Sequence, residues 1–312
     1  MKIIFFGSAQ FAVPCLRALR ESAHTVLCVI TQPDKKKGRG LHLEGTPVKD
    51  CAQKAGMQVY QPVSVNSPES VRLLRSFDAD LFVVVAYGQI LSQEVLDIPK
   101  LFAVNAHASL LPLYRGAAPI NWALIRGEHI TGVTIMKVIH KMDAGPVISA
   151  QELAIDVNDD DSTLEEKLSL LAAGALVKSI TDIERNTYSL DAQDESKATF
   201  APKLKKQDGL IDWNKPAREI AHLVRGCIVW PGAFTHYKGK LVKIYKAQVV
   251  PQIPVSGHPL PGQIKKISKE NIIVSAGDND LLIEELQIEG KRRMGVEEFI
   301  AGHKMSAGDR LG

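Results

Sequence analysis

Residues 81–86 (Leu-Phe-Val-Val-Val-Ala) are apolar at every position and rich in β-branched valine. A strand of this kind has no polar face, so it must be covered on both sides, as in a parallel sheet that carries helices on each face. The run belongs to a longer series in which apolar, β-rich segments alternate with segments of helical periodicity. That alternation predicts a doubly wound α/β domain with right-handed crossovers.

The alternating series occupies about the first 187 residues. We expect strands at 2–6, 25–31, 81–86, 103–107 and 133–139, and helices near 10–20, 47–55, 68–76, 119–126 and 162–184. Sheets of this type bind ligands beyond the carboxyl ends of their strands. Functional side chains are therefore expected at strand ends.

The rest of the chain has a different character. Residues 189–205 are polar and without periodicity, which predicts a linker. After a helix near 216–225, short strands at 240–246, 262–268, 271–275 and 281–288 are separated by Gly, Pro, Asn and Asp, a spacing that predicts a small, closed or nearly closed β-barrel. We therefore expect a mostly parallel, Rossmann-like domain at 1–188, the linker at 189–205 and an OB-like barrel domain at 206–312.

Composition and charge narrow the class of protein. No apolar run approaches the ~20 residues of a membrane span, and the first residues read as a strand rather than a secretory signal. The cysteines are too scattered for a disulfide framework or a zinc site, which favours the cytoplasm. Residues 206–312 hold 16 Lys and Arg against 12 Asp and Glu, whereas residues 1–187 hold 19 against 20. This excess favours a polyanionic partner, and an ordinary solvated face explains it equally well.

A nucleotide site at the first strand is not supported. The strand ends in Gly7-Ser8-Ala9-Gln10-Phe11. The dinucleotide fingerprint G-x-G-x-x-G needs further glycines so that the backbone can approach a pyrophosphate, and only Gly7 is present. The phosphate-loop pattern G-x-x-x-x-G-K-[ST] is also absent from the sequence. We interpret this first turn as structural, not as a site for NAD, FAD or ATP.

The candidate chemistry lies at 105–112, Asn-Ala-His-Ala-Ser-Leu-Leu-Pro. Asn105 and His107 are two residues apart on a predicted strand, so they point to the same side. A buried amide and imidazole are costly unless each is hydrogen-bonded. Asp143, in a Gly/Pro turn after the 133–139 strand, is placed to reach His107 if the two strands adjoin. A core histidine and a turn-forming aspartate remain the alternative interpretation.

Over nearly its whole length the chain resembles the methionyl-tRNA formyltransferase family. The matching stretches are 31–34 (TQPD), 38–40 (GRG), 47–49 (PVK), 61–62 (QP), 84–88 (VVAYG), 105–120, 131–136 (TGVTIM), 143–145 (DAG), 201–204 (APKL), 211–213 (IDW) and 230–231 (WP). The resemblance implies formyl transfer from 10-formyltetrahydrofolate to the methionine amino group of initiator methionyl-tRNA, in translation initiation. Asn105 and His107 would donate to the formyl oxygen, and His107 or a water held by Asp143 would accept the amine proton. The order of the proton transfers stays open.

The resemblance also implies a folate slot and a tRNA-binding surface. The slot is lined by Ser109, Leu110, Leu111 and Pro112 on one side and by Ala86, Tyr87, Gly88, Gln89 and Ile90 on the other. In the family, the loop equivalent to 34–41 enters the tRNA acceptor end. Arg39 would be its principal contact, because its planar fork reads base edges and phosphates. The phosphate contacts would fall to Lys35, Lys36, Lys37, Lys203 and Lys205.

Two alternatives stay open. A folate formyltransferase or hydrolase acting on a small molecule shares the Asn-His-Asp arrangement, although it needs neither the basic loop nor a cationic C-terminal domain. An RNA-binding protein with a decayed catalytic domain does not need all three of these residues. We expect no metal requirement, no membrane association and no obligate protein partner.

Overall fold

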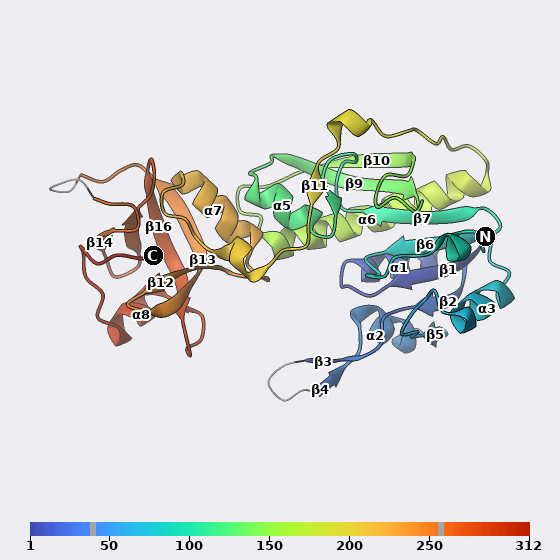
Figure 1. Cartoon of the computed structure of the whole chain (residues 1–312), viewed down its shortest axis with the longest axis horizontal. Coiled ribbons are helices and arrows are strands. Elements are labelled where there is room, and N and C mark those ends of the chain that lie inside the picture. The colour runs from blue at the N-terminus through green and yellow to red at the C-terminus, as the bar shows by residue number, and fades with distance from the viewer. Residues whose placement is uncertain (38–41, 255–258) are drawn as a thin grey trace. The chain divides into compact units, whose positions relative to one another are not determined.

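The structure, a computed structural model, describes residues 1–37, 42–254 and 259–312. Contacts between residues divide the chain into two compact units (Figure 1). The N-terminal unit comprises Met1–Pro119, Ile130–Ala154 and Glu165–Ala201, and the C-terminal unit comprises Ile120–His129, Ile155–Leu164 and Pro202–Gly312. Two short segments from earlier in the chain thus fold in the same unit as residues 202–312.

The N-terminal unit is built on a seven-stranded sheet in the order β10-β9-β7-β6-β1-β2-β5 (Figure 1). Its strands are β1 (Lys2–Gly7), β2 (Thr25–Ile30), β5 (Val59–Tyr60), β6 (Leu81–Val85), β7 (Phe102–His107), β9 (Ile130–Lys137) and β10 (Val147–Ala154). The strands from β7 to β5 are parallel, whereas β9 is antiparallel to both β7 and β10. The chain winds to one side of β1 and then to the other, so the predicted doubly wound, mostly parallel sheet is confirmed.

The sheet is buried on both faces, as its apolar central strands require. In β1, Ile4 and Phe6 pack with residues of helix α3 (Pro68–Ser76) in one hydrophobic cluster. The alternate residues Ile3 and Phe5 are also fully buried, and in a strand they point to the opposite face. Neither face of β1 meets water, which explains why its sequence shows no polar alternation.

Two helices begin where their capping residues predict. The side chain of Thr46 accepts a hydrogen bond from the backbone of Lys49 at 3.1 Å, and Ser67 accepts one from Ser70 at 3.2 Å. Each cap is followed by proline, which is preorganised for the first helical position. The helices of the described residues are α1 (Ala12–Glu21), α2 (Pro47–Lys54), α3, α4 (Gln93–Leu96), α5 (Pro119–Ile125), α6 (Asp161–Glu184), α7 (Ala217–Gly226) and α8 (Val296–Gly302). None of these helices is long and apolar enough to cross a membrane.

Short strand pairs complete the N-terminal unit. Strands β3 (Lys35–Lys37) and β4 (His42–Glu44) form an antiparallel pair, and β3 lies within the predicted basic loop 34–41. Strand β8 (Arg115–Gly116) pairs in parallel with β11 (Phe200–Ala201). This second pair joins the loop after β7 to a segment that the sequence predicted to be a linker.

The C-terminal unit is an antiparallel sheet in the order β12-β13-β16-β15-β14, with β17 added beside β16. Its strands are β12 (Ala233–Tyr237), β13 (Lys240–Val250), β14 (Ile264–Ile267), β15 (Ile272–Ser275), β16 (Asp280–Ile288) and β17 (Met294–Gly295). The C-terminal segment joins the two edge strands. Backbone N–H groups of Gly308 and Gly312 donate to Ile264 in β14 and to His236 in β12, respectively. The predicted, nearly closed barrel is confirmed, and its closure comes from the last residues of the chain.

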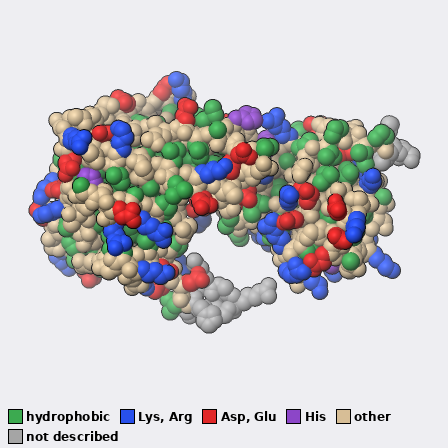
Figure 2. Space-filling view, turned by 180° about the vertical axis from the view of Figure 1, so that it is seen from behind, with side chains coloured by type: hydrophobic (Ala, Val, Ile, Leu, Met, Phe, Trp, Pro, Cys, Tyr) green, Lys and Arg blue, Asp and Glu red, His purple; other side chains and the backbone are tan. Residues whose placement is uncertain are grey.

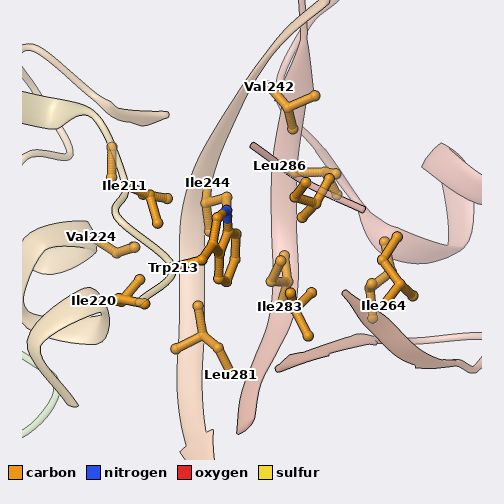
Figure 3. Packing of buried hydrophobic residues seen from close by; sticks show 14 of the residues in the cluster. Ile211, Trp213, Ile220, Val224, Val242, Ile244, Ile264, Leu281, Ile283 and Leu286 are labelled. Atoms are coloured by element: carbon orange, nitrogen blue, oxygen red, sulfur yellow. The ribbon is translucent and has the colours of Figure 1, made fainter. Parts of the chain in front are cut away.

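The barrel core is organised around Trp213 (Figure 3). Its ring is 4% exposed, and its Nε1 donates a hydrogen bond to Thr235 Oγ1 at 3.0 Å. Ile220 and Val224 of α7 and Ile244 of β13 belong to the same apolar cluster. The indole thus gains apolar packing without leaving its N–H unpaired, a condition that a buried tryptophan must meet.

Several elements were not predicted, among them strands β5, β10 and β12 and helices α4 and α8. Strand β10 contains Ala, Gln and Glu, which are weak strand formers, and it is stabilised by its register with β9. Strand β12 begins directly after the Trp230-Pro231-Gly232 turn, where the sequence gives no alternation. Both strands lie at sheet edges, where pairing outweighs local preference.

Candidate active site

Strand β7 carries the predicted Asn-His pair near its carboxyl end. Asn105 and His107 are two residues apart, so their side chains leave the same face of the sheet. Asn105 is half-buried and His107 is 6% exposed. In the sheet, Asn105 pairs with Val84 of β6 and with Met136 of β9. The backbones of two neighbouring strands therefore position the pair.

The contacts of His107 determine its tautomer. Nε2 lies 3.0 Å from the carbonyl oxygen of Tyr114. A carbonyl oxygen can only accept, so Nε2 carries the hydrogen and donates it. In the neutral ring Nδ1 is then unprotonated, and it lies 3.8 Å from Oδ2 of Asp143. Nδ1 is thus the nitrogen that can take up a proton, beside a carboxylate that would stabilise the resulting positive charge.

Asp143 reaches His107 by a different route from the one predicted. We expected the ends of two adjoining strands to meet, but β9 is antiparallel to β7. Lys137, at the end of β9, pairs with Val104, whereas His107 pairs with Thr134 further back along β9. The carboxyl ends of the two strands therefore lie apart. The loop 138–146 has to turn back to bring the aspartate to the histidine.

Asp143 is held through its side chain and lies in an unusual backbone conformation. Its Oδ2 accepts a hydrogen bond from the backbone N–H of Gly116 at 2.8 Å, and 14% of the side chain is exposed. Its φ is +49°, a region that aspartate tolerates better than most residues, since its short side chain can bond locally. One carboxylate oxygen thus contacts Gly116 and faces His107.

The Asn105 amide is free to bind a ligand. Within residues 1–37, 42–254 and 259–312, no hydrogen bond joins its side chain to another residue, and it is not among the buried unsatisfied groups. The N–H groups of this amide are therefore available to an oxygen of a bound molecule. Asn105, His107 and Asp143 together present a donor, a proton acceptor and a carboxylate on one side of the sheet.

The loop after β7 forms one predicted wall of the folate slot. Ser109 is buried, and its hydroxyl donates to the Leu113 carbonyl at 2.6 Å. Thr134 Oγ1 donates to the Ser109 carbonyl at 2.7 Å and accepts from the Leu111 N–H at 3.0 Å. These bonds pin the loop to β9. Leu110, Leu111 and Pro112 stay half-buried, so their side chains are the ones able to line a slot.

The predicted second wall follows β6, and its residues alternate in orientation. Ala86, Gly88 and Ile90 are exposed, the last at 67%. Tyr87 instead lies in the hydrophobic cluster with Phe6, so its ring lines the core. Gln89 is also occupied, because its side chain bonds to backbone groups of residues 63 and 65. Only the exposed members of this stretch and its backbone can face a ligand.

The switch point between β1 and β6 is spanned by the protein's own hydrogen bonds. The Ser8 hydroxyl donates to the Tyr87 carbonyl at 3.0 Å, and Gln32 Nε2 donates to the same oxygen at 2.9 Å. Thr31 Oγ1 bonds to Thr46 Oγ1 at 2.6 Å. Ser8 directly follows β1, in the first βα turn, which is where other doubly wound folds bind a dinucleotide phosphate.

The predicted RNA contacts divide between the two units. Lys35 is exposed, and its Nζ donates to Gln32 Oε1 at 2.6 Å. The backbones of Lys36 and Lys37 belong to β3, and Arg39 lies outside the described residues. Lys203 and Lys205 are exposed residues of the C-terminal unit. On the face of that unit shown in Figure 2, Lys and Arg side chains are interspersed with Asp and Glu.

A polar network beside the site escaped the sequence analysis. Arg115 is 2% exposed, and its guanidinium bonds to both carboxylate oxygens of Glu195, at 3.1 and 3.0 Å. Hydrogen bonds from Arg115 and then from Lys141 lower the pKa of the Glu195 carboxyl to about 2. A buried arginine requires such a partner, but nothing in the sequence shows which acidic residue, 80 positions away, provides it.

No cluster of three or more His, Cys, Asp or Glu with metal-binding geometry occurs in the described part of the chain. The side chains of the predicted site residues Asn105, His107 and Asp143 offer an amide, an imidazole and a carboxylate. This set suits acyl transfer, in which charge develops on an oxygen and protons move between nitrogens.

Comparison with known families identifies the class of protein. The family model for formyl transferases matches residues 1–180, and the model for the formyl transferase C-terminal domain matches residues 203–304. HypX from Aquifex aeolicus, solved in complex with tetrahydrofolic acid, aligns with a TM-score of 0.63 and 17% identity over 97% of this chain and 47% of its own. At this identity the likeness concerns the fold. The two-unit architecture is that of a formyl transferase.

Full-length relatives define the family further. Methionyl-tRNA formyltransferases from Caldanaerobacter subterraneus subsp. tengcongensis and from Acetivibrio thermocellus are each 44% identical to this chain, over 312 and 313 residues, and each alignment covers 100% of both proteins. The chain belongs to the methionyl-tRNA formyltransferase family. The resemblance noted in the sequence is confirmed.

Proposed function

We propose that this protein transfers the formyl group of 10-formyltetrahydrofolate to the amino group of methionine on initiator methionyl-tRNA. The observation that carries the proposal is the 44% identity, over the full length of both chains, to relatives of that name. The juxtaposition of Asn105, His107 and Asp143 supplies the chemistry. We assign catalysis to residues 1–188 and tRNA binding largely to 206–312.

The reaction replaces one carbon–nitrogen bond by another. The amine lone pair attacks the formyl carbon, negative charge grows on the formyl oxygen, and the bond to the folate nitrogen then breaks. The amine loses one proton and the folate nitrogen gains one, so no net proton or electron is consumed. The free amide of Asn105 is the donor for the developing oxyanion, a contribution of about 3 kcal/mol for one such group. The neutral His107 ring does not share this role as the sequence suggested, because its one N–H is donated to the Tyr114 carbonyl.

His107 and Asp143 are suited to handling the proton. Because Nε2 donates to the Tyr114 carbonyl, Nδ1 is the position that accepts the proton released by the amine. The carboxylate 3.8 Å away stabilises the imidazolium, and the same proton can then pass to the leaving folate nitrogen. This assignment uses one group as base and acid in turn.

The folate is placed between the two walls described above. Leu110, Leu111 and Pro112 offer apolar surface on one side, with Ala86, Gly88 and Ile90 on the other. The tetrahydrofolic acid complex of the similarly folded HypX supports a folate-derived donor. Ser109, Tyr87 and Gln89 would act by holding the walls in shape, since their side chains bond or pack within the protein.

The tRNA is recognised by charge and by the basic loop. Arg39 would contact bases or phosphates of the acceptor end, with Lys35, Lys36 and Lys37 neutralising phosphates nearby. Lys203 and Lys205 would extend the contact from the C-terminal unit. We assign the protein to the cytoplasm, where charged initiator tRNA is present.

The test is incubation of the purified protein with 10-formyltetrahydrofolate and methionine-charged initiator tRNA, followed by mass analysis of the released amino acid. Formylmethionine is expected with initiator tRNA, and much less with elongator methionyl-tRNA. A small amine, such as an amino sugar nucleotide, serves as the competing acceptor. If the small amine is formylated with the higher kcat/KM, the assignment to tRNA is wrong and the chain is a small-molecule formyltransferase.

A further inference from the structure

Residues 189–201, which we call the strap, bind along the loops that carry the site. The strap begins with a two-way backbone pairing of Asp191 with Val147, at 2.8 and 2.9 Å. At its other end, the Thr199 carbonyl accepts from the Arg115 N–H, and Thr199 Oγ1 accepts from the Tyr114 N–H, both at 2.9 Å. Tyr114 is the residue whose carbonyl binds His107. The strap is therefore part of the structure that surrounds the site.

Gln193 lies between these anchors and uses both ends of its side-chain amide. Its Nε2 donates to the carbonyl of Asp143 at 2.9 Å and to the carbonyl of Gly145 at 2.7 Å. Its Oε1 accepts from Arg115 Nε at 3.1 Å and from Nη2 at 2.7 Å. One side chain thus connects the aspartate loop to the buried arginine.

The neighbours of Gln193 also fix the orientation of its amide. A guanidinium is a pure donor and a carbonyl is a pure acceptor. A flipped amide would set an NH₂ group against Arg115 and an oxygen against two carbonyl oxygens, so only one orientation satisfies all four contacts. Arg115 is itself immobilised by its two bonds to Glu195. The donor end of Gln193 is therefore aimed at the aspartate loop.

The aspartate loop needs such support. Asp143 has φ of +49°, a conformation that few non-glycine residues adopt without tertiary contacts. The loop has to turn back from the end of β9 to reach His107. The backbone carbonyls of Asp143 and Gly145 both accept hydrogen bonds from the side-chain amide of Gln193, which lies outside this loop. Losing that amide would release the loop at the residue that carries the carboxylate.

We propose that Gln193 is a positioning residue for formyl transfer, which acts by holding Asp143 against His107. The inference rests on the proposed function and assigns a role to a residue that does not itself touch the substrate. A carboxylate displaced by about 1 Å is expected to lower the rate of the chemical step by roughly 10²-fold, while binding of donor and tRNA changes little.

The experiment compares three variants with wild type in the methionyl-tRNA formylation assay, using the full-length protein. Gln193→Ala removes both ends of the amide. Gln193→Glu keeps the acceptor for Arg115 and removes the two donors to the aspartate loop. Asp194→Ala is the matched control, because in the described part of the chain the Asp194 side chain bonds to Ser196 and Lys197 of the strap and to no residue of the aspartate loop. Thermal unfolding of each variant shows that the comparison is made between folded proteins.

The expected result is a fall in kcat of about 10- to 100-fold for both Gln193 variants, with KM for both substrates within about threefold and with Asp194→Ala near wild type. In an Asp143→Asn background, measured by single turnover, Gln193→Ala should change the rate by less than about twofold, because the residue through which it acts is already altered. A purely structural role would instead lower the rate equally in both backgrounds.

Two outcomes overturn the inference alone: an active wild type with unchanged kcat in Gln193→Ala, or equal losses in Asp194→Ala and Gln193→Ala. A folded wild type that formylates no methionyl-tRNA would instead overturn the proposed function, and with it this role for Gln193. The two failures are therefore distinguishable in one set of measurements.

Discussion

Replacing Asn105 with alanine should separate catalysis from stability in this protein. The amide has no hydrogen bond to the described residues, so its removal leaves no protein group unpaired. The strand around it is held by backbone pairing with Val84 and Met136, which the substitution preserves. The free energy of unfolding should therefore change by less than about 1 kcal/mol.

The catalytic effect should be much larger. One donor to a developing oxyanion contributes about 3 kcal/mol, which corresponds to a fall in kcat of roughly 10²-fold. Because this interaction is made in the transition state, kcat and kcat/KM should fall together while KM stays nearly constant. Asn105→Asp keeps the size of the side chain but replaces the donor with a negative charge, and kcat should be at least as low.

The measurements are single-turnover formylation of methionyl-tRNA at saturating donor and urea unfolding of each variant. His107→Ala is the contrasting variant, because it removes a buried imidazole together with its hydrogen bond to the Tyr114 carbonyl and should cost about 1–3 kcal/mol of stability as well as activity. If Asn105→Ala keeps kcat within about threefold of wild type, the oxyanion role of this residue is refuted.

Three further predictions concern other parts of the molecule. Tyr87→Phe should stabilise the fold by about 1 kcal/mol in urea unfolding, because the buried hydroxyl has no hydrogen-bond partner in the described structure; a loss of stability would show that the hydroxyl is bonded. Burial, then Arg225 and Arg218, lower the pKa of His222 to about 4. In the unfolded chain the pKa of a histidine is about 6.5, so between that pH and about pH 4 the unfolded state binds more protons than the folded state. The free energy of unfolding should therefore decline by roughly 1–2 kcal/mol as the pH falls from about 6.5 to about 4, a figure already reduced for the partial exposure of the ring. His222→Gln should flatten this decline. Arg39→Ala should reduce the preference for initiator over elongator methionyl-tRNA, and tRNA affinity should fall steeply with salt; an unchanged preference or a flat salt response would contradict the assignment to the basic loop.

Much of the fold could be predicted from local patterns. The fully apolar strand at 81–86 required a sheet covered on both faces, and the helices expected near 47–55 and 68–76 are present as α2 and α3. Strand β10 was missed, because after Val147 and Ile148 it continues through Ala, Gln and Glu, which favour a strand weakly and are held in one by pairing with β9. Local preference predicted the central elements well and the edge elements poorly.

The candidate site shows the same division. Asn105 and His107 lie on one side of β7, because side chains two residues apart in a strand point the same way. This could be predicted as soon as the segment was assigned as a strand. The direction of β9 could not be read in this way. Its antiparallel course means that Asp143 approaches His107 through a returning loop and not from a shared sheet edge. Gln193 gave no signal, because it lies in a polar segment without periodicity.

By itself, the sequence determined which segments become buried strands and which residue types face one side of β7, because periodicity and composition act over a few neighbouring residues. Only the tertiary structure decided that Arg115, Gln193 and Glu195 meet beside the aspartate loop. Those contacts join residues 48 to 80 positions apart, and they form because a buried guanidinium and two turned-back carbonyls must all find partners in the same place.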